Sequence, residues 1–277
     1  MNTLFMRDTG PFEKFSNPGK SRSSFKVGLF DFWLLFGAGL GSLLGAYLVV
    51  FGFRMASDYT FVFIYFAASA LYAALTAAIA ATLPRKASLP VLPIFEGRRA
   101  RSLTLRKGIS PVLAALAVGV IAAYAVLCYD HAITRLLIGP GSIAINPPPR
   151  HPATGPLDIV STAILEEILF RAVLFPALAI AIERVYGPLI AHGTRTPFWI
   201  ANVLQAVVFG AAHIALGGGM LKAKPWYMRL PLVSQTWGGL MLGYIYWTCG
   251  IESAIVCHAT FDLSLELIRR IGHVPLV

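Results

Sequence analysis

The chain has 277 residues, of which 57% are hydrophobic and 13% are charged, and its mean hydropathy is +0.69. Soluble domains carry about 25% charged residues, so this composition excludes an ordinary soluble domain and indicates an integral membrane protein. The net charge of +10 does not indicate a nucleic-acid partner, because most of the basic residues lie in two blocks that resemble the cytoplasmic flanks of membrane spans.

Apolar segments separated by short polar links predict an all-α, polytopic transmembrane helical bundle of about seven spans, with six to eight compatible with the pattern. The predicted spans are residues 27–53, 59–83, 110–128, 158–182, 197–216, 232–247 and 251–268. The predicted organisation is a polar, basic N-terminal arm at 1–26, N-terminal spans and loops at 27–157, a core at 158–268 and a C-terminal tail at 269–277. We expect the protein to be integral to the cell (inner) membrane, with membrane lipid around it.

The fourth predicted span is unusual because it combines an apolar sequence with three ionisable residues, Glu166, Glu167 and Arg171. An ionised side chain at the centre of a spanning helix costs about 2.5–3.5 kcal/mol on insertion scales. Such residues are retained where they face a protein interior or a water-filled cavity, so we expect this span to form the centre of an active site. Pro176 in the same span is expected to kink it, because proline removes one backbone donor.

The two glutamates are expected to have different environments. Glu167 and Arg171 are four residues apart and lie on one helix face, in the favourable acid-before-base order. Glu166 points about 100° away and is freer to meet other helices and water. A charge network between helices, without catalysis, would also account for these residues.

Two later spans carry ionisable residues of their own. The fifth holds Phe209 and His213, and the seventh holds His258 and Asp262, again four residues apart. A His and a carboxylate at that spacing can ligate a metal, orient a water or transfer a proton. The fourth span runs antiparallel to the fifth and seventh, so Glu166, His213 and Asp262 are predicted at the same depth.

The ordered set of motifs resembles a known family. Glu166-Glu167-x-x-x-Arg171, Phe209-x-x-x-His213 and His258-x-x-x-Asp262 are similar to the motifs of the CPBP family. This family comprises CAAX prenyl endopeptidases and bacteriocin-processing or immunity proteins, intramembrane proteases also called the Abi family. The resemblance covers roughly residues 158–268, and it implies hydrolysis of a peptide bond at or near the membrane.

By position, the resemblance makes Glu166 the general base, with His213 holding the attacking water and His258 facing the oxyanion. Glu167, Arg171 and Phe209 take supporting roles. The family carries Asn where this chain has Asp262, and an ionised Asp only accepts hydrogen bonds. Asp262 is therefore protonated, orients His258, or ligates a metal. No cofactor is firmly predicted. If Zn²⁺ is present, its ligands are His213, His258 and Asp262 with Glu166.

The predicted partner is a peptide or protein substrate, lipid-modified substrates included. Two other functions are compatible with the sequence. One is a non-catalytic immunity or scaffold protein that binds a peptide without cutting it. The other is a proton- or cation-coupled transporter that uses the same ionisable residues as a relay. The two halves of a transporter often resemble each other in sequence, and residues 27–128 and 158–268 show no such resemblance.

Overall fold

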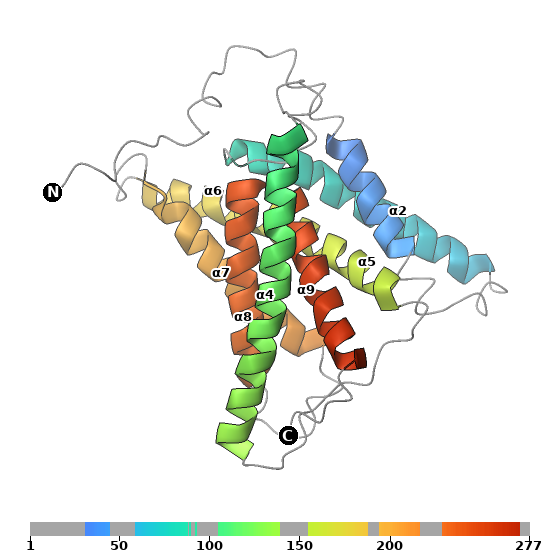
Figure 1. The fold of residues 1–277 in the computed structure, drawn as a ribbon. Coiled ribbons are helices and arrows are strands. Elements are labelled where there is room, and N and C mark those ends of the chain that lie inside the picture. Colours follow the sequence, from blue (N-terminus) through green and yellow to red (C-terminus); the bar gives the residue numbers. More distant parts are fainter. Residues whose placement is uncertain are drawn as a thin grey trace.

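The computed structural model describes residues 31–44, 59–87, 89, 92, 105–138, 155–187, 194–216 and 229–271. All regular secondary structure within these ranges is helical (Figure 1), which confirms the predicted all-α class. The elements are the helix Asp31–Leu44, α2 (Tyr59–Lys86), α4 (Leu105–Ile138), α5 (Gly155–Glu167), η3 (Ile168–Leu174), α6 (Phe175–Tyr186), α7 (Thr196–Leu216), α8 (Arg229–Cys249) and α9 (Ile251–Ile271). Each of the seven predicted spans contains described helix, although the first span (27–53) is described only at 31–44, and α4 and α8 are longer than their predicted spans at both ends. The predicted arm at residues 1–26 lies outside the described residues.

The fourth predicted span is one continuous helical segment whose middle is a π-helix. Element η3 follows directly on Glu167, and the backbone N–H of Phe175 donates to the carbonyl of Phe170, five residues earlier. Pro176 follows at the start of α6 and has no N–H to donate to Ala172. The backbone therefore accommodates Pro176 with a wider, π-helical turn before it. π-Turns of this kind are often found at functional sites.

The interior of the bundle is built from small and aromatic side chains. Phe175 on α6 and Tyr246 on α8 are fully buried and meet edge to face, with ring centroids 5.7 Å apart. Ile251 begins α9 in the same cluster, directly after a one-residue turn at Gly250. Gly250 has φ of 90°, a conformation that other residues rarely adopt, so glycine is suited to this turn between α8 and α9.

Helices α7 and α8 are joined by polar side chains as well as by close packing. Asn202 donates to the carbonyl of Leu240 (3.1 Å), and Gln205 donates to the carbonyl of Gly239 (2.9 Å). Both amides are fully buried. A Cβ on Gly243 would lie 2.0 Å from the Asn202 side-chain oxygen, so only glycine leaves room for these amides. This pairing fixes α7, and with it Phe209 and His213, against α8.

Helix α4 lies along α9 (Figure 1), and Gly119 is a point of close contact between the two helices. A Cβ on Gly119 would lie 2.6 Å from the carbonyl oxygen of Cys257 and 2.9 Å from Cβ of Thr260. Cys257 directly precedes His258, and Thr260 follows it by two residues. The contact therefore sets how near α4 can approach the part of α9 that carries the motif residues.

Replacing Gly119 with alanine is expected to lower the free energy of unfolding in detergent by about 1–3 kcal/mol, because α4 must move away from the α9 backbone. The loss is measured as a lower melting temperature. The matched control is Gly37→Ala, where an added Cβ meets nothing within 4 Å. The comparison removes the gain in helix propensity that the two substitutions share. Equal melting temperatures for the two variants would contradict the close approach at Gly119.

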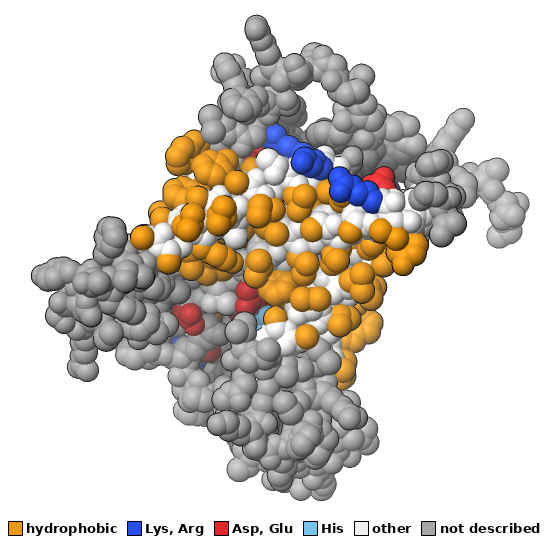
Figure 2. Space-filling view, turned by 180° about the vertical axis from the view of Figure 1, so that it is seen from behind, with side chains coloured by type: hydrophobic (Ala, Val, Ile, Leu, Met, Phe, Trp, Pro, Cys, Tyr) orange, Lys and Arg blue, Asp and Glu red, His pale blue; other side chains and the backbone are white. Residues whose placement is uncertain are grey.

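The exterior of the described part is strongly apolar. Leu75, Ile121, Val203 and Trp237, on four different helices, expose between 47% and 67% of their surface. Figure 2 shows hydrophobic side chains spread over one face, with Lys and Arg side chains along its upper edge. In the described part, two helical segments, Ala67–Lys86 and Ser110–Tyr129, are long and apolar enough to cross a membrane. Core helices of soluble proteins can meet the same criterion, so the two segments are weak evidence for a membrane protein.

Candidate active site

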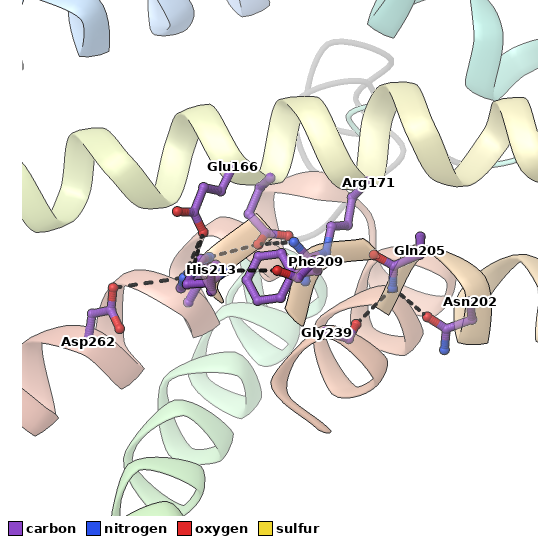
Figure 3. A network of polar contacts seen from close by, with 10 residues as sticks. Glu166, Arg171, Asn202, Gln205, Phe209, His213, Gly239 and Asp262 are labelled. Atoms are coloured by element: carbon purple, nitrogen blue, oxygen red, sulfur yellow. Dashed lines mark hydrogen bonds and ion pairs between the residues drawn. The ribbon is translucent and has the colours of Figure 1, made fainter. Parts of the chain in front are cut away.

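Four of the predicted site residues meet from three helices (Figure 3). Oε2 of Glu166, on α5, lies 3.6 Å from Nε2 of His213 on α7 and 3.7 Å from Nε2 of His258 on α9. Oδ2 of Asp262, one turn beyond His258, lies 3.8 Å from the same His258 nitrogen. Glu166, His213 and Asp262 thus lie close together, as predicted from their similar depth in the spans.

Glu167 and Arg171 lie behind this group and are both fully buried. Nη1 of Arg171 is 3.1 Å from Oε1 of Glu167, which confirms the predicted pairing along the helix. The same carboxylate oxygen is 2.8 Å from Nδ1 of His258, a contact across helices that spacing within one span did not predict. Glu167 therefore links the arginine of its own span to the histidine of α9.

The hydrogen bonds of the two histidines determine what their other nitrogens can do. Nδ1 of His213 is 2.9 Å from the backbone carbonyl of Phe209, which can only accept, so Nδ1 carries the proton. Nδ1 of His258 likewise donates to the Glu167 carboxylate. In its neutral form each ring then presents a lone pair at Nε2, toward Glu166. A second proton on His258 would turn its Nε2 into a donor.

Phe209 supports the site in two ways. Its carbonyl orients His213, and its ring lies beneath the Arg171 guanidinium, with Cζ 4.4 Å from the ring centroid. Phe170 meets the same ring edge to face, with centroids 5.0 Å apart. A cation over an aromatic face is stabilised by the ring quadrupole, and the effect grows when water is excluded. This helps to explain how a buried arginine with Nε and Nη2 lacking acceptors among the described residues is tolerated.

The meeting point opens into a cavity of about 340 Å³. Its polar lining comes from Glu166, His213, His258 and Asp262, together with three uncharged side chains that the sequence motifs did not single out. These three are Thr162, Ser234 and Gln235. The apolar lining residues are Val126, Leu127, Phe209, Met241, Leu242, Phe261 and Leu265. Polar and apolar side chains thus share the lining, and a pocket that combines apolar walls with placed polar groups can both bind and orient a ligand.

The fit of a metal ion can be judged from the same residues. Within the described ranges, no group of three or more His, Cys, Asp or Glu side chains is placed to hold a metal ion. The set considered for zinc from the sequence, His213, His258 and Asp262 with Glu166, is close together but does not form such a group in this structure.

Comparison with known proteins agrees with the motifs. Residues 150–264 match the model of a family described as type II CAAX prenyl endopeptidase, Rce1-like. The matched segment includes every motif residue, from Glu166 to Asp262, and it confirms the family resemblance predicted from the sequence. No curated protein and no solved structure gives a significant match.

Proposed function

We propose, from the match of residues 150–264 to the model of the type II CAAX prenyl endopeptidase family, that the chain is a membrane-embedded endopeptidase in which Glu166 activates a water. One observation carries the proposal. The Glu166 carboxylate faces the cavity between two imidazole nitrogens, at 3.6 and 3.7 Å, in a largely apolar segment. A carboxylate in this setting can accept a proton from a water held in hydrogen-bond reach.

The first step follows from the acceptors that face the cavity. A water between Oε2 of Glu166 and Nε2 of His213 can donate one hydrogen to each, which leaves its oxygen lone pairs directed toward a bound peptide carbonyl. Transfer of one proton to Glu166 accompanies attack of the oxygen on the carbonyl carbon. Glu166 then returns this proton to the nitrogen of the leaving amine as the C–N bond breaks, so that the water adds across the peptide bond.

His258 is suited to the charge that develops on the carbonyl oxygen. Its Nδ1 is anchored to Glu167, so the ring direction is fixed and Nε2 faces the cavity. When Nε2 carries a proton, it can donate to the oxyanion, a type of stabilisation that is worth about 10²–10³-fold in kcat per donor. When Asp262 is ionised, its carboxylate can only accept hydrogen bonds. In that form it cannot donate a second hydrogen bond to the oxyanion.

A membrane location is part of the proposal. The exposed apolar side chains of α2, α4, α7 and α8 suit a lipid environment, and the ionisable residues of the motifs lie at or directly behind the wall of one cavity. The substrate in this proposal is a peptide segment at or near the bilayer, lipid-modified segments included. The site would reach it through the cavity between α4, α5, α7, α8 and α9.

The test is peptide cleavage by the purified full chain in detergent, with products identified by mass spectrometry. Glu166→Gln keeps the shape of the side chain but removes the base, and it is expected to lower kcat by about 10²–10⁴-fold. Glu183→Gln is the matched control, because Glu183 is exposed on α6, outside the cavity lining, and its loss is expected to leave cleavage unchanged.

A strong chelator is included in parallel reactions. Cleavage that is lost in Glu166→Gln and indifferent to the chelator supports a water activated by glutamate alone. Cleavage that is lost on chelation and restored by Zn²⁺ would make Glu166, His213, His258 and Asp262 metal ligands and overturn the mechanism. No cleavage of a broad panel of membrane peptides, prenylated CAAX peptides included, would contradict the endopeptidase assignment.

A further inference from the structure

Asp262 is a second carboxylate on the cavity wall that the proposed chemistry does not use. Its Oδ2 lies 3.8 Å from Nε2 of His258, which is longer than a hydrogen bond. About a quarter of the side chain, 24%, is exposed, on the side that lines the cavity. The carboxylate therefore keeps acceptor capacity for a group that enters the cavity.

The described lining of the cavity around Asp262 contains acids and histidines but no permanent cation. Two of the cavity-lining residues, Glu166 and Asp262, are carboxylic acids, and none of the described lining residues is Lys or Arg. Arg171 does not line the cavity, and its charge is engaged behind the wall by Glu167 at 3.1 Å. Even when His258 carries its second proton, its single charge does not balance the two carboxylates Glu166 and Asp262, so a substrate group near Asp262 meets net negative charge.

The neighbouring histidine shows that this part of the wall is built to bind a polar group. His258 is 6% exposed, and its Nδ1 is held by Glu167 at 2.8 Å. Its Nε2 faces the cavity and lies 3.7 and 3.8 Å from the two carboxylates, without a hydrogen bond to either. Nε2 of His258 is thus held in place between the Glu166 and Asp262 carboxylates. Each carboxylate can then bind a separate group of the substrate on its own side of the imidazole.

We propose that Asp262 is a specificity-determining residue, which selects substrates that carry an ammonium or guanidinium group next to the bond that is cut. The inference rests on the proposed function, because it requires that the cavity receives a peptide. The cation is a Lys or Arg side chain or a free N-terminal amine, since both offer the same donors. An Asn at this position would offer a neutral amide and no such selection by charge.

The kinetic test compares peptides that differ in one residue beside the mapped cut, Lys in one and the uncharged norleucine in the other. Wild-type protein is expected to prefer the Lys peptide by about tenfold or more in kcat/KM, as a hydrogen bond to a charged group would give. Asp262→Asn is expected to bring the ratio close to one, whatever its effect on the absolute rates. Glu266→Gln is the matched control on α9, because Glu266 is paired with Arg270 at 2.8 Å, and it is expected to keep the wild-type ratio.

A binding test separates this inference from the endopeptidase assignment. In full-length Glu166→Gln protein, fluorescence anisotropy is expected to show tighter binding of a labelled Lys peptide than of its norleucine counterpart, by about tenfold. The difference is expected to vanish in Glu166→Gln/Asp262→Asn. If the wild type cuts no peptide but this difference holds, the protease assignment fails and the cation site stands.

Two further outcomes would overturn the inference. One is equal binding of the Lys and norleucine peptides, and the other is a preference that survives Asp262→Asn. Peptides with acetylated and free N-termini, each with and without Lys, identify the source of the cation. A preference that follows Lys assigns the site to a side chain, and one that follows the free amine assigns it to the N-terminus.

Discussion

Replacing Arg171 with methionine is expected to destabilise the protein by about 3–5 kcal/mol, because the substitution leaves the buried Glu167 carboxylate without its cation. Methionine fills similar volume over the Phe209 ring, so most of the loss is electrostatic rather than a cavity effect. Thermal unfolding in detergent measures the loss. Arg184→Met, at an exposed position on α6, is the control and is expected to change stability by less than about 0.5 kcal/mol.

A double variant identifies the cause of this loss. Glu167→Gln/Arg171→Met removes both charges, so it is expected to be more stable than Arg171→Met alone. A double variant that is less stable than either single one would mean that the two residues act independently. That result would contradict the shared role of the Glu167 carboxylate between Arg171 and His258.

Replacing Glu167 with glutamine is expected to lower kcat by about 10–100-fold while KM changes little. The amide keeps the size of the side chain, but it removes the charge that holds Nδ1–H of His258 at 2.8 Å and Arg171 at 3.1 Å. The ring of His258 then loses its fixed direction toward the cavity. Because Glu167 is fully buried and does not line the cavity, substrate binding is expected to be preserved.

The measurement is steady-state cleavage by Glu167→Gln and, for comparison, by Glu252→Gln, a carboxylate in the first turn of α9 outside the cavity lining. Melting temperatures recorded on the same samples separate a catalytic defect from unfolding. A rise in KM with kcat unchanged would mean that Glu167 acts in substrate binding. An unaltered kcat would exclude a role for Glu167 in orienting His258.

Much of the helical framework could be predicted from the sequence, because apolar segments and polar links are sharply divided along this chain. The convergence of Glu166, His213 and Asp262 followed from their depth in antiparallel spans. The link from Glu167 to His258 could not be predicted in the same way. Spacing shows which residues share a face of one helix, whereas this contact depends on how α9 is rotated relative to α5.

The remaining differences have physical reasons of the same kind. Pro176 indicated a disturbance in its span, but the sequence did not show whether the backbone would bend or widen into the π-helix of η3. Asn202 and Gln205 are polar residues within a predicted span, and this signal was available. Their role became visible only with α8 in place, since their partners are the backbone carbonyls of Leu240 and Gly239.

The widened turn of η3 also settles which side chains of this long segment can share one side of it. Six nearly fully buried residues follow one another at intervals of four: Ile159, Ala163, Glu167, Arg171, Phe175 and Ala179. On an ideal α-helix each interval of four overshoots a full turn by about 40°, so five intervals would carry Ala179 about 200° away from Ile159. A π-turn winds less per residue and offsets part of this drift. A graft of the whole buried row from Ile159 to Ala179 onto another helix would therefore have to copy the widened turn as well as the side chains.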